Sequence, residues 1–204
     1  MRALIAFFLG VLLATATSLT AIDSPFTSEN GAVVLDGHDL VIRNANLIIG
    51  DGIAYGAGNL LVGPGHIVQG DANVAFGNRH YIVGNRNVAL GGSRHYLFSA
   101  YAASLGGYRT GIWDTTQYGT IVGGILNRMT SGTYGTMAGG YQNLSTGSYT
   151  FLGGGNQTHA TATLATTLGG LFNRATASRA TAIGGYGAQA NTVDAIEFGV
   201  PVPP

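Results

Sequence analysis

Three histidines recur at nearly constant spacing and are the best candidates for metal chemistry in this sequence. They are His66, His80 and His95, and the later two each lie in an Arg-His-Tyr triplet. Imidazoles that lie one above another could bind a divalent metal ion. No carboxylate and no second histidine recurs with them. We therefore expect no metal and no cofactor, and interpret these histidines as a surface ladder of stacked side chains.

Aromatic residues concentrate between positions 96 and 118, which also hold the only Trp. Exposed aromatic side chains are common anchors of protein contacts. The same rings could instead pack on the protein's own surface or across an oligomer. Both interpretations stay open for the six members of this candidate contact patch: Tyr96, Phe98, Tyr101, Tyr108, Trp113 and Tyr118.

Two sequons, Asn143-Leu-Ser and Asn156-Gln-Thr, are candidate N-glycosylation sites. About two such triplets are expected by chance in a chain of this composition. Both follow a glycine-rich stretch that we expect to form a solvent-facing turn. If the source is eukaryotic, the chain is therefore expected to be a glycoprotein.

Catalytic signatures are missing from the sequence. It contains no GxSxG, no P-loop, no HExxH and no recurring pair of carboxylates, so we do not expect an enzyme. Nine Arg balance nine acidic residues, and Lys and Cys are absent. A net charge of zero disfavours nucleic acid as a partner. The absence of Cys excludes a disulfide scaffold and thiolate metal sites.

Residues 1–21 have the pattern of a secretory signal peptide. Arg2 precedes an apolar run from Ala3 to Ala14, and small residues suited to cleavage follow. The run is shorter than the roughly 20 residues that span a bilayer as a helix. We predict cleavage, no membrane span in the mature chain, and a secreted, extracellular or cell-surface location. Residues 22–32 are then a linker or cap, and residues 200–204 a Pro-rich tail.

The rest of the chain repeats a short apolar word that ends in glycine. These glycines recur about every 15 residues, a spacing typical of a repeat architecture. Only Gly adopts positive φ in a tight turn at little cost, so we predict that they are turn residues. They are Gly50, Gly63, Gly77, Gly91, Gly106, Gly123, Gly139, Gly153, Gly169, Gly184 and Gly199. A twelfth word, Val33-Val-Leu-Asp36, fits the same frame.

A period near 15 is too short for a pair of helices but suits one coil of a β-solenoid with two short strands. We predict an all-β parallel β-solenoid over residues 33–199, with about twelve coils and a length of about 55 Å. Recurring asparagines are expected at the corners, where Asn tolerates left-handed backbone and stacked amides can bond from coil to coil. They are Asn46, Asn59, Asn73, Asn87, Asn127, Asn143 and Asn173.

The residue before each glycine is always apolar, and the residue three before it is often Thr. Positions two apart share one face of a strand, so we expect both to point inward. This places Leu168, Ile183, Thr166 and Thr181 in the core. The middle residues of the words are then expected to point outward, among them Leu61, Ile121, Met137 and Phe151.

These words resemble the YadA-like head repeats of trimeric autotransporter adhesins. The matching stretches are Asn73-Val-Ala-Phe-Gly77, Asn87-Val-Ala-Leu-Gly91, Thr181-Ala-Ile-Gly184 and Gly187-Ala-Gln-Ala190. The resemblance implies a left-handed parallel β-roll, three chains side by side, and a role in adhesion or surface structure. A heptad-patterned stalk and a membrane anchor are not seen in the sequence, which puts anchoring by the family's route in doubt.

We therefore expect a secreted structural or adhesive rod whose main partner is itself, with a host or environmental surface as a further partner. A closed homotrimer and an open extracellular filament both fit. The alternative is a solenoid that binds ice or a glycan. Flat threonine ladders can order water, but the expected inward phase of the threonines argues against ice.

Overall fold

The computed structural model describes residues 26–29, 32–35, 45–113 and 117–201. The predicted signal peptide, 1–21, and the end of the predicted tail, 202–204, lie outside the described residues. The chain divides into two units, Met1–Val41 and Ile42–Pro204.

The described part of the first unit is an antiparallel hairpin. Strand β1 (Phe26–Glu29) pairs with β2 (Ala32–Leu35), with Phe26 opposite Leu35. The prediction that the word ending at Asp36 forms a first coil of the solenoid is therefore wrong. Its apolar residues, which lack a closing glycine, pair locally with the preceding strand instead of with a neighbouring coil.

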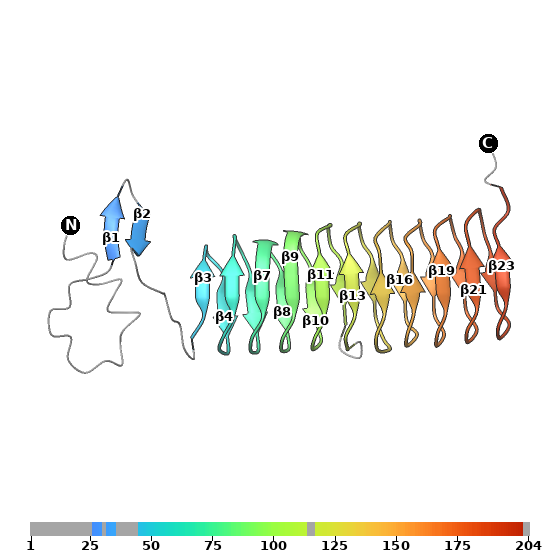
Figure 1. Cartoon of the computed structure of the whole chain (residues 1–204), viewed down its shortest axis with the longest axis horizontal. Helices are drawn as coiled ribbons and strands as arrows, with labels where there is room; N and C mark the ends of the chain where they lie inside the picture. The colour runs from blue at the N-terminus through green and yellow to red at the C-terminus, as the bar shows by residue number, and fades with distance from the viewer. Residues whose placement is uncertain (1–25, 30–31, 36–44, 114–116, 202–204) are drawn as a thin grey trace. The chain divides into compact units, whose positions relative to one another are not determined.

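The second unit is an all-β parallel β-solenoid of about ten coils, which confirms the predicted fold class with a slightly lower coil count. Two sheets run along it (Figure 1). We call them the odd sheet and the even sheet. The odd sheet consists of β3 (Leu47–Ile49), β5 (Leu60–Val62), β7 (Val74–Asn78), β9 (Val88–Ser93), β11 (Ala103–Leu105), β13 (Thr120–Val122), β15 (Thr136–Met137), β17 (Phe151–Leu152), β19 (Thr166–Leu168), β21 (Thr181–Ile183) and β23 (Ile196–Phe198).

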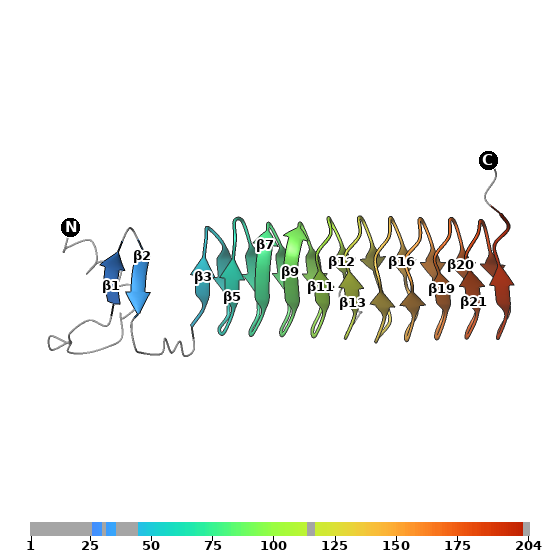
Figure 2. The ribbon, with the colours of Figure 1, turned by 45° about the horizontal axis from the view of Figure 1, so that its top comes forward.

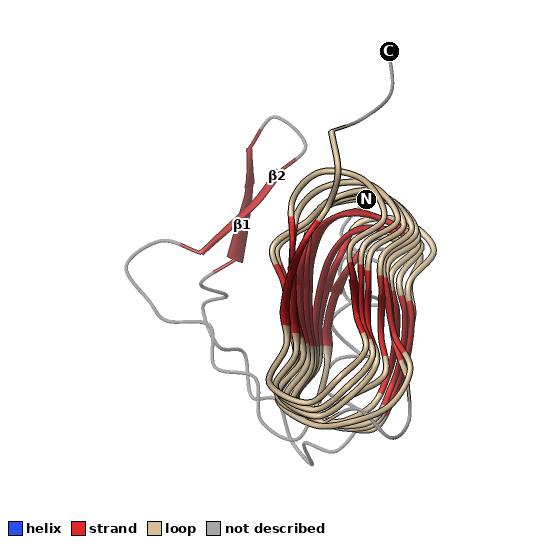
Figure 3. Cartoon of the chain, turned by 90° about the vertical axis from the view of Figure 1, so that its right-hand side faces the viewer, coloured by secondary structure: helices blue, strands red, loops and turns tan. Residues whose placement is uncertain are grey.

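The even sheet consists of β4 (Ile53–Tyr55), β6 (Ile67–Gln69), β8 (Tyr81–Val83), β10 (Tyr96–Phe98), β12 (Gly111–Ile112), β14 (Arg128–Met129), β16 (Leu144–Ser145), β18 (His159–Ala160), β20 (Arg174–Ala175) and β22 (Gln189–Ala190). Each strand pairs in parallel with its copy one coil away, as in Leu47 with Leu60 and Ile53 with Ile67. The repeated coils are seen from a second angle in Figure 2. Viewed along the stack, the two sheets face each other and are joined by corners at both ends (Figure 3).

The core lies one residue away from the predicted phase. The odd-strand residues in register with Leu61 point inward. Leu61, Ile121 and Met137 of this column are fully buried, whereas Leu168, in the next column, is 39% exposed. Strand β17 starts one residue later than expected: Phe151 pairs with Thr166, and Thr150 is a buried corner residue. A shift of one residue moves every side chain of a strand to its other face. The threonine column therefore faces outward.

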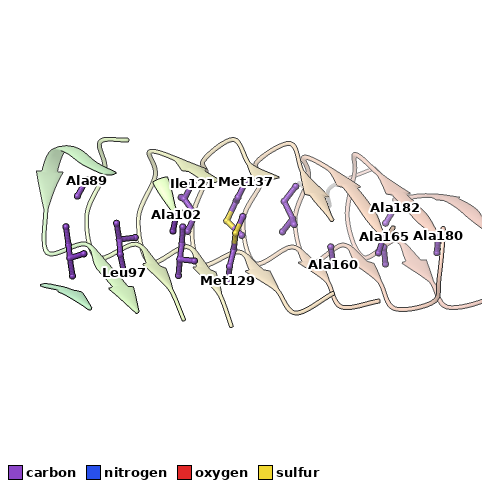
Figure 4. Packing of buried hydrophobic residues seen from close by; sticks show 14 of the residues in the cluster. Ala89, Leu97, Ala102, Ile121, Met129, Met137, Ala160, Ala165, Ala180 and Ala182 are labelled. Carbon is purple, nitrogen blue, oxygen red and sulfur yellow. The ribbon is translucent and has the colours of Figure 1, made fainter. Parts of the chain in front are cut away.

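Each coil fills its thin core with one inward residue from each strand. In several coils a large inward residue on one strand is combined with a small one on the other strand. Leu97 and Ala89 are one such pair (Figure 4). Met137 and Ser145 are another. Toward the C-terminus both are small, as with Ala182 and Ala190. The volume of the core therefore decreases toward the C-terminal coils.

Left-handed backbone recurs at two corners of the coils. Sixteen non-glycine residues have φ between 53° and 63°, and each immediately precedes an inward corner residue. One row is Ala72, Arg86, Tyr101, Tyr118, Tyr134, Tyr149, Leu164, Arg179 and Asp194. The other is Arg79, Arg94, Arg109, Leu126, Gln142, Gln157 and Phe172. The recurring asparagines are not among them, so the expectation that Asn takes the left-handed position is wrong.

The predicted turn glycines mostly have the expected backbone. Positive φ is found at Gly50, Gly63, Gly77, Gly91, Gly106, Gly123, Gly139, Gly169 and Gly184. Gly153 and Gly199 do not have it. Because Leu152 pairs with Thr167, the residue in register with Gly169 is Gly154, whose φ is 103°. The shift of β17 that places Phe151 outward therefore also moves its turn glycine by one position.

Two leucines of adjacent coils in the odd sheet test the phase of the core. We expect Leu152→Ala to lower the free energy of unfolding by about 2–5 kcal/mol, because it leaves a cavity at a fully buried position. Leu168→Ala should cost less than about 1 kcal/mol, because this side chain is already partly exposed. Denaturant unfolding measures both. An equal loss in the two variants would contradict the phase described above.

The double glycine at 169–170 provides a second test. A Cβ at Gly170 would collide with Asn173 Nδ2 and lie 2.5 Å from the Gly185 carbonyl oxygen, whereas a Cβ at Gly169 meets nothing within 4 Å. Gly170→Ala should therefore destabilise the protein by about 2–3 kcal/mol, and Gly169→Ala by about 1 kcal/mol. Thermal or denaturant unfolding gives the ranking, and a larger effect at Gly169 would refute it.

Candidate functional site

The three predicted ladder histidines do form a stack, but inside the solenoid. His66, His80 and His95 are at most 1% exposed. The rings of His66 and His80 are stacked with centroids 5.0 Å apart, and those of His80 and His95 with centroids 4.6 Å apart. The expectation of a surface ladder is therefore wrong, because the inward corner position lies just before each even strand.

Both ring nitrogens of these histidines are occupied. The Nε2 atoms of His66, His80 and His95 lie 3.1, 2.9 and 3.0 Å from the carbonyl oxygens of Val62, Phe76 and Gly91, so each carries the proton. The Nδ1 atoms of His66 and His80 accept the backbone N–H of the next histidine at 3.2 Å. The Nδ1 of His95 accepts from the Thr110 hydroxyl. A metal ion would have to displace one of these bonds at each ring.

Burial sets the charge state of this stack. The pKa of His80 is lowered to about 4, chiefly by desolvation and also by the neighbouring histidines. Desolvation also lowers the pKa of His95. The described residues contain no cluster of three or more His, Cys, Asp or Glu that could hold a metal ion. His80 and His95 are thus neutral structural groups at pH 7.

The recurring asparagines occupy the same kind of inward corner and confirm the expected bonding from coil to coil. Asn59 Oδ1 accepts the backbone N–H of Asn73 at 2.9 Å and its Nδ2–H at 3.0 Å. Asn73 Oδ1 accepts the backbone N–H of Asn87 at 2.9 Å. At the opposite corner, Asn127 Oδ1 accepts the backbone N–H of Asn143 at 3.0 Å.

The two sequons lie in different environments. Asn143 is 1% exposed, and its Nδ2 donates to the carbonyl oxygens of Gly139 at 2.9 Å and Gly155 at 3.0 Å. The expectation that both sequons face solvent is therefore wrong for Asn143, whose amide could not carry a glycan in this fold. Asn156 is exposed, and its side chain is free of such bonds among the described residues.

The six aromatic residues of the candidate contact patch separate into three groups. Tyr96, Phe98 and Trp113 stack on the outer face of the even sheet, with the Phe98 and Trp113 centroids 4.9 Å apart. Tyr101 and Tyr118 belong to the first left-handed row, and Tyr108 lies beside the second. Residues 114–116, within the same stretch of sequence, lie outside the described residues. The structure does not bring the six together as one patch.

Sequence reasoning missed the length of the tyrosine row. Tyr101, Tyr118, Tyr134 and Tyr149 stack on one another with centroids 4.8 to 5.1 Å apart. They are 42 to 54% exposed. The Arg86 guanidinium covers the ring of Tyr101 at 5.3 Å from the centroid. Because neighbouring rings cover each other's faces, the row presents ring edges and hydroxyls to a partner. Each of these tyrosines lies two residues before an odd strand, and this regular spacing was the signal in the sequence that could have revealed the row.

A row of arginines was also missed. Arg79, Arg94 and Arg109 occupy the second left-handed row in three successive coils. Their backbone N–H groups each donate to the preceding coil, as Arg94 does to Asn78 and Arg109 to Ser93. The repeated Arg-His-Tyr triplet was the signal: histidine points inward, so its two neighbours point outward.

The outer face of the odd sheet carries exposed apolar side chains from its first strand to its last. Its eleven strands carry one charged residue, Glu197, in the last of them. The exposed large apolar side chains on this sheet include Ile49, Leu90, Val122, Phe151, Leu168, Ile196 and Phe198. The even sheet, by contrast, carries Arg128, His159 and Arg174.

No protein-family model, curated protein or solved structure matches this chain. Within the described ranges, no helix is long and apolar enough to cross a membrane. The parallel β-solenoid and the rows of side chains on its surface are therefore the observations on which function is argued.

The histidine stack predicts a loss of stability in mild acid. The folded-state pKa of His80, about 4, is below the unfolded value of 6.5, so the unfolded chain binds more protons between these values. The contribution of neutral His80 to the free energy of unfolding is fully present above about pH 6.5. It should fall by up to about 3 kcal/mol as the pH drops to about 4. Denaturant unfolding across this range measures the loss.

The variant His80→Asn/His95→Asn is the matched control, because Asn127 and Asn143 already occupy the same inward column. It should fold and lose most of the dependence on pH between 4 and 6.5. An unchanged dependence in this variant would show that the histidine stack is not its source.

Proposed function

We propose that the chain is a secreted structural or adhesive rod that associates with copies of itself through the outer face of the odd sheet. The observation that carries this proposal is the nearly charge-free apolar surface that follows this sheet from β3 to β23. Exposed apolar surface of this extent is typical of protein contact sites. In proteins that stay monomeric, exposed strand edges and sheet faces usually carry charges that oppose association. The outer face of the odd sheet carries almost none.

The resemblance to YadA-like head repeats supports a closed form of this association. In that interpretation the solenoid is a left-handed roll, and three chains pack side by side. An open lateral filament uses the same surface without closure. The exposed Asn156 is the one sequon of the two that would suit a glycoprotein. Secretion rests on the signal-peptide pattern of residues 1–21.

Charges placed on the outer face of the odd sheet test self-association. We expect the purified chain to form trimers or longer assemblies in light scattering and negative-stain microscopy. Leu90→Glu/Val122→Glu should convert it to a folded monomer, because both side chains are exposed on this face, at 40 and 45%, and a buried unpaired carboxylate is costly at an interface.

The matched control is Leu144→Glu/Gln189→Glu, which places two carboxylates on the outer face of the even sheet beside arginines. It should assemble like the unmodified chain. A compact monomer formed by the unmodified chain at micromolar concentration, or equal dissociation of both variants, would refute the proposal.

Ice binding is the second candidate, and one observation favours it. Thr120, Thr136, Thr166 and Thr181 lie in one outward column of the odd sheet, interrupted by Phe151. The expectation that these threonines point inward argued against ice binding. The buried column is instead the neighbouring one, which includes Ile121 and Met137, so the threonines face outward. Thermal hysteresis or adsorption to growing ice, lost in Thr166→Val/Thr181→Val, would support this candidate over self-association.

A further inference from the structure

Three arginines lie in a row at one corner of the solenoid. Arg79, Arg94 and Arg109 follow one another in successive coils, so their backbones are about 4.8 Å apart. Arg79 and Arg109 are exposed, and Arg94 is half-buried. Each side chain projects from left-handed backbone, which holds the three Cβ atoms in the same orientation.

The row has no acidic partner among the described residues. The one ion pair in that part of the chain joins Arg179 to Asp194, at the opposite corner. Asp51 lies at the same corner as the row, two coils before Arg79, and its Oδ1 accepts the backbone N–H of Gly65. Arg94 donates to the hydroxyl of Tyr108 at 2.7 Å, a neutral partner. Three like charges at this spacing repel one another, and an anion would relieve that repulsion.

A shallow groove lies beside the first two arginines of the row, and Arg109 continues the row beyond it. Its lining includes Arg79, Arg94, Tyr81 and Tyr96, together with Gly65 and Ile67. Tyr81 and Tyr96 are paired in register on the outer face of the even sheet, and both are half-buried. A cationic edge therefore lies next to a floor of aromatic and aliphatic side chains.

We propose that this groove binds a linear acidic polysaccharide, with its carboxylate or sulfate groups along Arg79, Arg94 and Arg109. Guanidinium groups bind planar or tetrahedral oxyanions through paired N–H donors. The apolar faces of the sugar rings rest on Tyr81 and Tyr96. The proposal does not depend on self-association, because the groove is on the even sheet and the apolar face is on the odd sheet.

The geometry favours a polysaccharide over nucleic acid. The charges of an extended acidic polysaccharide repeat once per sugar or disaccharide, and the arginines repeat once per coil. Nucleic-acid binding sites usually neutralise more phosphates and belong to strongly basic proteins, whereas this chain has no net charge.

Binding can be measured by affinity electrophoresis and calorimetry with the purified full chain at low ionic strength. The probes are polygalacturonate for carboxylates, dextran sulfate for sulfate esters, neutral dextran as a blank, and oligodeoxythymidylate for nucleic acid. We expect one or both acidic polysaccharides to bind, neutral dextran not to bind, and binding to weaken as salt is added.

Arg79→Gln/Arg94→Gln/Arg109→Gln should weaken binding about ten-fold or more, as expected for the loss of three exposed charge contacts. Gln is tolerated in this row, because Gln142 and Gln157 have the same left-handed backbone. Arg86→Gln/Arg174→Gln/Arg179→Gln removes the same charge elsewhere and should bind within about two-fold of the unmodified chain. Arg86 and Arg179 belong to the first left-handed row and Arg174 to β20, so none of them is part of the arginine row.

Three results would overturn the proposal. The first is that neither acidic polysaccharide binds the unmodified chain. The second is an equal loss in both triple variants, which would show an effect of net charge alone. The third is oligodeoxythymidylate binding as tightly as the polysaccharides, which would assign the row to nucleic acid.

Discussion

The structure depends on satisfying the backbone groups buried at the two corners of each coil. Strand ladders satisfy the straight segments, but a corner turns its N–H and C=O groups away from the neighbouring strands, and a buried unpaired group is costly. An inward side chain supplies the missing partner. Asn73 shows the full pattern: its Nδ2 donates to the Gly84 carbonyl at 2.9 Å, and its Oδ1 accepts the N–H of Asn87 in the next coil.

The chain satisfies these corners in two chemical ways. In the first coils an amide or imidazole bridges to the next coil. In later coils alanine replaces the amide before the odd strands, and a tight turn supplies the bond, as when the N–H of Ala180 donates to the Ala177 carbonyl oxygen at 3.2 Å. The smaller corner residue accompanies a smaller core, in which Ala182 and Ala190 are the inward strand residues. At the corner before the odd strands, the size of the corner residue and the volume of the core therefore decrease together, whereas Asn173 keeps the amide bridge at the other corner.

The repeat predicted the class of fold because spacing alone determines which strands can pair. Which residues of each strand point into the core was not predictable in the same way. Words such as Leu60-Leu61-Val62 are apolar at every position, so alternation cannot distinguish the core from a face that is apolar for another reason. To predict that the histidines point inward, His80 and Asn127 would have to be placed in one column, although they follow their glycines at different distances. The hairpin at Ala32–Leu35 was missed because its apolar pattern matches a coil.

The two left-handed rows separate what the fold requires from what the surface displays. Arg, Tyr, Gln, Leu, Phe and Asp all occupy the same backbone conformation there, with φ values between 53° and 63°. Their side chains take no part in the core, so the scaffold constrains conformation at these positions but is nearly indifferent to residue type. Residues of a row can therefore be substituted one coil at a time without change to the core. Solenoids related by such substitutions can differ in binding specificity while their interiors remain the same.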